Sequence, residues 1–129
     1  MKPSTQQWLE FAKADLVNCE RILEDEFLTT ILAFHSQQVV EKCFKALINE
    51  KNIDIPRIHS LVRLYQLVEG FLENQIEIRE LMALDSVYTS SRYPSDIGMI
   101  ATGKPTRQDA LSLYESAKKI FESITELIA

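Results

Sequence analysis

Glycine and proline are scarce in this sequence, with three Gly and four Pro among 129 residues. Folds built from many short strands need turn residues at short intervals, and Gly and Pro are among the commonest of these. The sequence also has no segment in which Val, Ile or Thr alternates regularly with polar residues, the pattern of a half-buried strand. These absences argue against an all-β fold and favour long helices.

Cysteine is also rare. Cys19 and Cys43 are the only two, and the sequence has neither a Cys-x-x-Cys motif nor a nearby His pair at the spacing of metal ligands. Both fall on the apolar faces of expected helices, so we predict buried free thiols instead of a disulfide or a metal site. We expect no cofactor, because the Walker A, Gly-x-Gly-x-x-Gly, His-Glu-x-x-His and Gly-x-Ser-x-Gly motifs are missing as well.

Long apolar runs are missing too. No segment approaches the roughly 18 uninterrupted apolar residues of a membrane span, and residues 1–4 do not open a signal peptide. We therefore expect a cytoplasmic protein that does not associate with membranes. Its length, with 46% hydrophobic and 26% charged residues, suits one domain over residues 1–129.

Five segments have the hydrophobic spacing of amphipathic helices. Ser4 and Gln7 resemble a capping box for the first helix, and Thr106 with Asp109 resembles an N-cap for the last. The predicted helices span residues 5–24, 28–51, 57–69 and 75–90, with a fifth that follows Thr106 and ends near residue 128. Their apolar stripes must be buried against one another, which predicts an all-α fold: an antiparallel up-and-down four-helix bundle with an additional short helix, the third.

The formal net charge of −5 argues against indiscriminate binding to nucleic acids. Cationic residues nevertheless dominate two stretches, with five Lys and Arg against three Asp and Glu over residues 31–63, and three against one over residues 91–107. If the fold brings these stretches together, they form a local site that attracts anions. Differences of this size also arise by chance.

A polar strip runs along the second predicted helix. His35, Gln38, Lys42 and Lys45 are separated by three, four and three positions, which places them on one side of the helix beside its apolar face. Such a strip can hold a phosphate or a carboxylate. The alternative is a solvated edge of the core on which Glu41 and Lys45 form an ion pair.

His59 lies near the expected start of the third helix, where unpaired backbone N–H groups favour anions. Arg57 adds a positive charge beside it. A capping or packing role is the alternative for this histidine.

Arg92 and Tyr93 stand directly before Pro94, which biases Tyr93 toward an extended conformation. An Arg side chain suits phosphate, and a Tyr ring can stack on a base. The alternative is a helix end at which Arg92 pairs with a carboxylate and Tyr93 is packed.

Three ordered motifs resemble the prokaryotic HEPN domain: the segment from Gln37 to Leu47, the stretch His59-Ser60-Leu61, and Arg92-Tyr93-Pro94. Trp8, Ala14-Asp15-Leu16 and the last helix agree in order and spacing, so the resemblance spans nearly the whole chain. It implies an up-and-down helical bundle, commonly a homodimer. It also implies a gene beside that of a minimal nucleotidyltransferase, and a role as the substrate-binding subunit of that enzyme or as one half of a toxin–antitoxin pair.

Many HEPN ribonucleases carry an Arg followed after four to six residues by a His. This sequence lacks that spacing, since Arg57 precedes His59 by two positions, Arg21 precedes His35 by fourteen, and no His follows Arg92. We therefore expect a non-catalytic subunit that binds a nucleotide or another phosphate-bearing ligand. The residues expected to bind it are His35, Gln38, Lys42, Lys45, His59, Arg92 and Tyr93. A divergent ribonuclease toxin with RNA as its ligand, and a purely structural helical partner, are the alternatives.

Overall fold

The structure, a computed structural model, describes the backbone of residues 1–92 and 104–129 and the side chains of residues 1–87 and 104–129. These parts of the chain are helical and contain no strand. The α-helices are α1 (Pro3–Arg21), α2 (Thr29–Glu50), α3 (Leu61–Val68), α4 (Ile78–Arg92) and α6 (Arg107–Ile128), and the 3-10 turns are η1 (Glu26–Leu28) and η2 (Glu69–Phe71).

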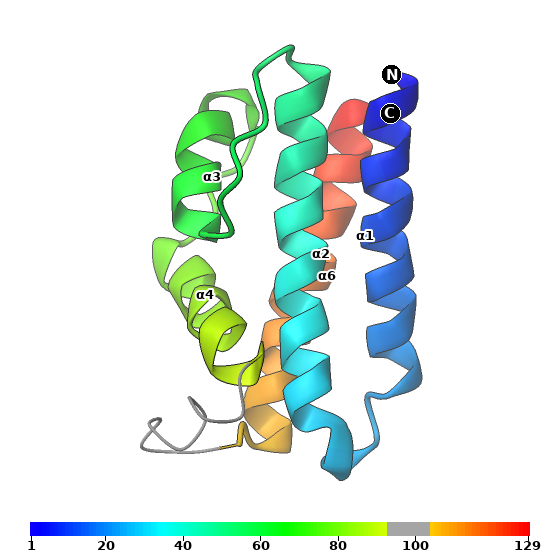
Figure 1. Ribbon diagram of the computed structural model, residues 1–129, viewed down its shortest axis with the longest axis vertical. Coiled ribbons are helices and arrows are strands. Elements are labelled where there is room, and N and C mark those ends of the chain that lie inside the picture. The colour runs from blue at the N-terminus through cyan, green and yellow to red at the C-terminus, as the bar shows by residue number, and fades with distance from the viewer. Residues whose placement is uncertain (93–103) are drawn as a thin grey trace.

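The long helices alternate in direction (Figure 1). Helices α1 and α4 run one way and α2 and α6 the other, so that both chain termini lie at the same end. Helix α2 stands in the centre, with α1 on one side, the α3–α4 pair on the other, and α6 behind it. The predicted antiparallel bundle of four long helices with an additional short helix is confirmed.

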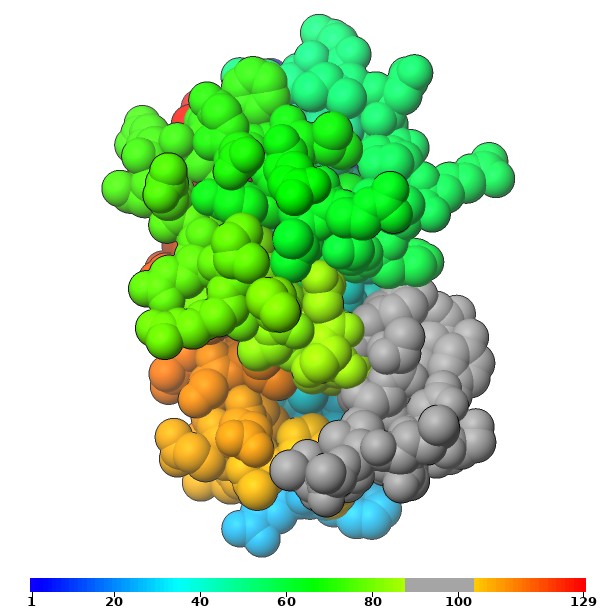
Figure 2. Space-filling view, turned by 90° about the vertical axis from the view of Figure 1, so that its left-hand side faces the viewer, coloured from blue at the N-terminus to red at the C-terminus, as the bar shows by residue number. Residues whose placement is uncertain are grey.

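Helix α2 is central because apolar residues occupy a wide arc of its surface. Its Leu32, Phe44 and Leu47 are almost completely buried, and they join residues of every other α-helix in one core. Burying a side chain of this size contributes about 1.5–3 kcal/mol. Figure 2 shows the face that α3 and α4 cover, with the start of α6 below them.

Both cysteines are free and buried in this core, as predicted. Burial raises the pKa of Cys19 to about 11, and it raises the pKa of Cys43 further. Thiols protonated in this way are poor nucleophiles and poor metal ligands. Within the described residues, no group of three His, Cys, Asp or Glu side chains is placed to hold a metal ion.

The start of α1 differs from the prediction. The helix begins at Pro3, so Ser4 lies inside its first turn and the predicted capping box is wrong. The Ser4 hydroxyl instead accepts a hydrogen bond of 2.7 Å from the Asn49 side chain, while the backbone N–H of Lys2 donates to Glu50. Contacts with the end of α2, which local sequence does not reveal, replace the local cap.

Helix α3 is shorter than predicted. It begins at Leu61 and not at residue 57, so residues 57–60 lie before the helix. Ser60 is its N-cap, and the Ser60 side chain accepts a hydrogen bond from the backbone N–H of Arg63. The helix ends at Val68, one residue before its predicted end, and continues as η2.

Two other helix starts test the predicted boundaries. Helix α4 begins three residues later than predicted, at Ile78. The cap of α6 is confirmed, since the Thr106 hydroxyl accepts a hydrogen bond of 3.1 Å from the backbone N–H of Asp109. None of the helices in the described part of the chain has the length and apolar character that crossing a membrane requires.

Candidate ligand-binding site

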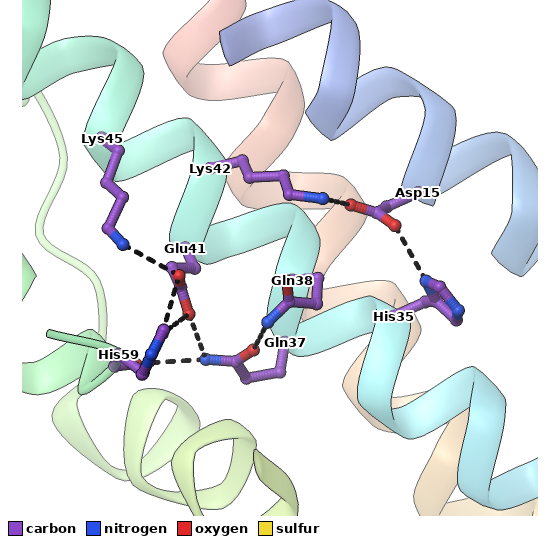
Figure 3. Close-up of polar contacts among 8 residues, drawn as sticks. All are labelled: Asp15, His35, Gln37, Gln38, Glu41, Lys42, Lys45 and His59. Carbon is purple, nitrogen blue, oxygen red and sulfur yellow. Dashed lines mark hydrogen bonds and ion pairs between the residues drawn. The ribbon is translucent and has the colours of Figure 1, made fainter. Parts of the chain in front are cut away.

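Helices α1 and α2 carry a set of polar side chains, called the polar network below (Figure 3). Asp15 belongs to α1, whereas His35, Gln38, Lys42 and Lys45 belong to α2. Their spacing of three or four residues aligns the α2 side chains along one side of that helix, as predicted. The network divides into two groups, each centred on a carboxylate.

Asp15 is the centre of the first group. One carboxylate oxygen, Oδ1, lies 2.8 Å from Nδ1 of His35, and the other forms a close ion pair with the ammonium group of Lys42. The side chains of His35 and Lys42 are 27% and 25% exposed, and that of Asp15 is 11% exposed. The more deeply buried carboxylate of Asp15 therefore holds the partly exposed side chains of His35 and Lys42 close together.

The sequence contains a signal for Asp15, although the spacing of the cationic residues does not indicate it. Asp15 lies among the buried positions Ala12, Leu16 and Cys19 of α1. A carboxylate on an apolar helix face needs a partner, because burying an unpaired charge is very costly. An acidic residue at such a position predicts a cation on the facing helix.

The environment of Asp15 also fixes its protonation. Burial by itself raises the pKa of Asp15, but the hydrogen bonds and charges of His35 and Lys42 outweigh burial, and the pKa lies below its ordinary value. Asp15 is consequently ionised at neutral pH.

We expect Asp15 to make stability depend on pH in the acidic range. Because its pKa is lowered in the folded protein, the carboxylate contributes stability that is complete above its unfolded pKa and disappears as the pH falls through its folded pKa. Urea denaturation of the wild type and of Asp15→Asn should give a constant gap in free energy of unfolding above about pH 5 and a shrinking gap below about pH 4. A gap independent of pH would contradict the assigned role of the charge.

Glu41 is the centre of the second group. It lies 3.0 Å from the ammonium nitrogen of Lys45 and 3.1 Å from Nδ1 of His59. The amide nitrogen of Gln37 donates to Glu41 and to the backbone carbonyl of His59, both at 3.2 Å, and the Gln38 amide donates to Gln37. Glu41 thus ties the segment before α3 to the centre of α2.

The ion pair between Glu41 and Lys45 is present, but it is not at a solvated edge. The side chains of Glu41 and Lys45 are only 7% and 8% exposed. The ammonium group of Lys45 also lies 5.9 Å from the centre of the Trp8 ring, within cation–π distance. Lys45 is therefore an internal part of the network, whereas His59 is 51% exposed.

The structure brings five of the seven predicted binding residues into these two groups. His35 and Lys42 meet at Asp15, while Lys45, His59 and, through Gln37, Gln38 meet at Glu41. Arg92 is the last residue of α4, and its side chain lies outside the described part of the structure. Tyr93, like Pro94, lies outside the described residues altogether, so the joining of the two cationic stretches stays a prediction.

Comparison with known families identifies the chain. The model of the HEPN domain matches residues 5–127. The chain belongs to the HEPN family. A comparison with curated proteins found no match.

Two crystal structures are similar to this HEPN chain. TT1696 from Thermus thermophilus superposes with a TM-score of 0.78 at 22% identity, over 98% of this chain and 99% of that one. ST0689, an archaeal HEPN homologue, superposes with a TM-score of 0.70 at 25% identity, over the whole of both chains. The likeness to TT1696 is evidence for the fold alone.

Several of the residues that carry the HEPN resemblance belong to the polar network. Gln37, Gln38 and Glu41 stand on α2, and Glu41 contacts His59 of the second motif. Asp15, from the first helix, belongs to the other group, with His35 and Lys42. In this HEPN domain the first two motifs therefore meet where Glu41 contacts His59.

Proposed function

We propose that this HEPN domain is a non-catalytic binding subunit that works with a separate minimal nucleotidyltransferase and binds a nucleotide or another phosphate-bearing ligand on the α1–α2 face. The observation that carries the proposal is the pair of partly exposed side chains, the Lys42 ammonium group and the His35 imidazole, that Asp15 holds close together. A phosphate group is matched by several N–H donors that are fixed before it arrives.

The exposure of each side chain supports a division of roles. Lys42, His35 and His59 reach the surface and are the groups that contact the ligand, while Gln38 lies between them on α2. Lys45 is buried against Glu41 and keeps the network in place.

Asp15 limits the ligands that this face accepts. Its negative charge offsets the cations that it holds, so a bare anion gains little from binding here. A ligand with apolar or hydrogen-bonding groups beside its phosphate gains more, which favours a nucleotide over inorganic phosphate. The overall charge of −5 also favours a nucleotide over inorganic phosphate, since a generic phosphate binder is usually basic.

Exposed apolar side chains beside the network support a protein partner. Phe11 precedes Asp15 by four residues on α1, and Ile31 precedes His35 by four on α2, so each lies next to the network on its own helix. Phe11 is 60% exposed and Ile31 is 43% exposed. We propose that a second copy of the chain or the nucleotidyltransferase covers these residues, which light scattering of the purified protein and co-purification with the neighbouring nucleotidyltransferase will distinguish.

Replacing Lys42 by Met is expected to weaken ATP binding by about ten-fold, because one charge-assisted hydrogen bond to phosphate is lost. Calorimetry with ATP at low salt measures the affinity. Lys118→Met is the matched control, since Lys118 is an exposed lysine on α6. If wild-type protein binds no nucleotide and forms no complex with the nucleotidyltransferase, the proposed function is wrong.

One observation favours the second candidate, a divergent ribonuclease. The hydrogen bond that Asp15 accepts from Nδ1 of His35 orients the imidazole as a carboxylate orients a general base. Incubating the purified protein with RNA tests this candidate, and we expect the RNA to stay intact. RNA cleavage that His35→Ala abolishes would replace the binding proposal with the enzymatic one.

A further inference from the structure

The starts of α2 and α6 meet at the end of the bundle opposite the termini. Figure 1 places both helix starts there, and Figure 2 shows the start of α6 (gold) next to that of α2 (light blue). A cavity of about 340 Å³ lies between them. It is lined by Glu26, Thr29, Lys104, Pro105, Thr106 and Arg107.

Thr29 gives the first indication that this cavity binds something. Its side chain is at the first position of α2 and is only 3% exposed. Its hydroxyl oxygen, Oγ1, has no hydrogen-bond partner among the residues that the structure describes. An unpaired buried hydroxyl destabilises the fold, and a ligand that accepts its hydrogen bond recovers that loss.

The electrostatics of the cavity give the second indication. Two helices of 22 residues begin at its walls, and each directs the positive end of its dipole toward it. Lys104 and Arg107 add positive charge. The Nε–H of Arg107 is buried and lacks a hydrogen-bond partner within the described residues, so it is a second unused donor.

The present partners of these cations are weak competitors. The ammonium group of Lys104 donates to the carbonyl of Phe27, and Arg107 pairs with Glu24 at 2.8 Å. The side chain of Glu24 is almost fully exposed, and such surface ion pairs contribute little. An anion in the cavity can therefore recruit Arg107 at small cost.

We propose that this cavity is a binding site for a phosphate group, separate from the α1–α2 face. The hydroxyl of Thr29, the N–H groups at the two helix starts and the side chains of Lys104 and Arg107 supply the donors. Glu26 supplies an acceptor, which suits the proton of a hydrogen phosphate or a hydroxyl of the molecule that carries the phosphate. Sulfate at neutral pH has no such proton, so it binds less well.

Thr29→Val tests the site without threatening the fold, because it removes a hydroxyl that makes no hydrogen bond to the described residues and preserves the shape of the side chain. Thr29→Ser retains the hydroxyl. The probes are inorganic phosphate and AMP, titrated at constant ionic strength and followed by the amide signals of residues 29–31 and 107–108 in NMR spectra. Sulfate serves as the control anion.

We expect saturable shifts of these signals in the wild type and in Thr29→Ser, and an affinity about ten-fold lower in Thr29→Val. Saturation by inorganic phosphate identifies free phosphate as sufficient, and saturation by AMP alone identifies a phosphate monoester as the ligand. The proposed site is refuted if neither phosphate nor AMP produces saturable shifts of these signals. It is also refuted if Thr29→Val binds phosphate as tightly as the wild type does and sulfate binds the wild type as tightly as phosphate does. Loss of ATP binding in Lys42→Met leaves this result unchanged, so the two proposals fail separately.

Discussion

Replacing Glu41 by Ala is expected to lower the free energy of unfolding by about 3–5 kcal/mol, because the buried ammonium group of Lys45 loses the carboxylate with which it is paired. The substitution also removes the acceptor for Gln37 and for Nδ1 of His59. A charge left without compensation inside a protein costs far more than the pair contributes. Urea denaturation followed by circular dichroism measures the loss.

A double variant separates the unpaired charge from the lost packing. Replacing Glu41 by Leu and Lys45 by Met together removes both charges and keeps most of the side-chain volume, so it should recover most of the stability lost in Glu41→Ala. Glu80→Ala is the more exposed counterpart: its ion pair with Lys119 at 3.9 Å lies near the surface and should contribute less than about 1 kcal/mol. If Glu41→Ala and Glu80→Ala prove equally mild, the buried network does not stabilise the bundle.

The bundle was predictable because its signals are periodic and repeated. In α6 the residues Ala110, Tyr114, Ala117, Ile120 and Ile124 are buried at the spacing that the sequence shows. The cap at Thr106 was predictable too, since both partners of its hydrogen bond lie within four residues. Where a boundary depends on local chemistry alone, sequence is sufficient.

The boundaries that were wrong depend on contacts between distant segments. Ser4 could not be recognised as the partner of Asn49, which lies 45 residues away. Helix α3 begins at Leu61 and not at the predicted residue 57, because Asp85, on another helix, accepts hydrogen bonds from its first turn. Tertiary partners of this kind leave little trace in a single sequence.

The candidate site was half predicted. The cations of α2 were found because their spacing is visible within one helix, whereas Asp15 was missed although it holds His35 and Lys42. The spacing of positive residues does not indicate which carboxylate positions them. Thr29 was not predicted as a binding residue either, because only the folded structure shows that its hydroxyl has no hydrogen-bond partner among the described residues.

Replacing Asp85 by Ala is expected to cost about 2–4 kcal/mol of stability and to loosen α3 first, because the carboxylate of Asp85 caps that helix from α4. One carboxylate oxygen of Asp85 accepts a hydrogen bond of 2.7 Å from the backbone N–H of Leu61. The other lies 3.3 Å from the N–H of Val62 and 3.3 Å from the hydroxyl of Ser60. An eight-residue helix has little stability of its own and depends on such contacts.

The matched control is Asp109→Ala, which removes an exposed carboxylate from the first turn of α6 and should cost only about 0.3–1 kcal/mol through the helix dipole. Hydrogen exchange distinguishes the two: Asp85→Ala should accelerate exchange of the Leu61 and Val62 amides before those of α2. Since His59 directly precedes this first turn and contacts Glu41, the same variant should also weaken ATP binding on the α1–α2 face. Unchanged exchange at Leu61 would mean that packing, and not this carboxylate, holds α3 in place.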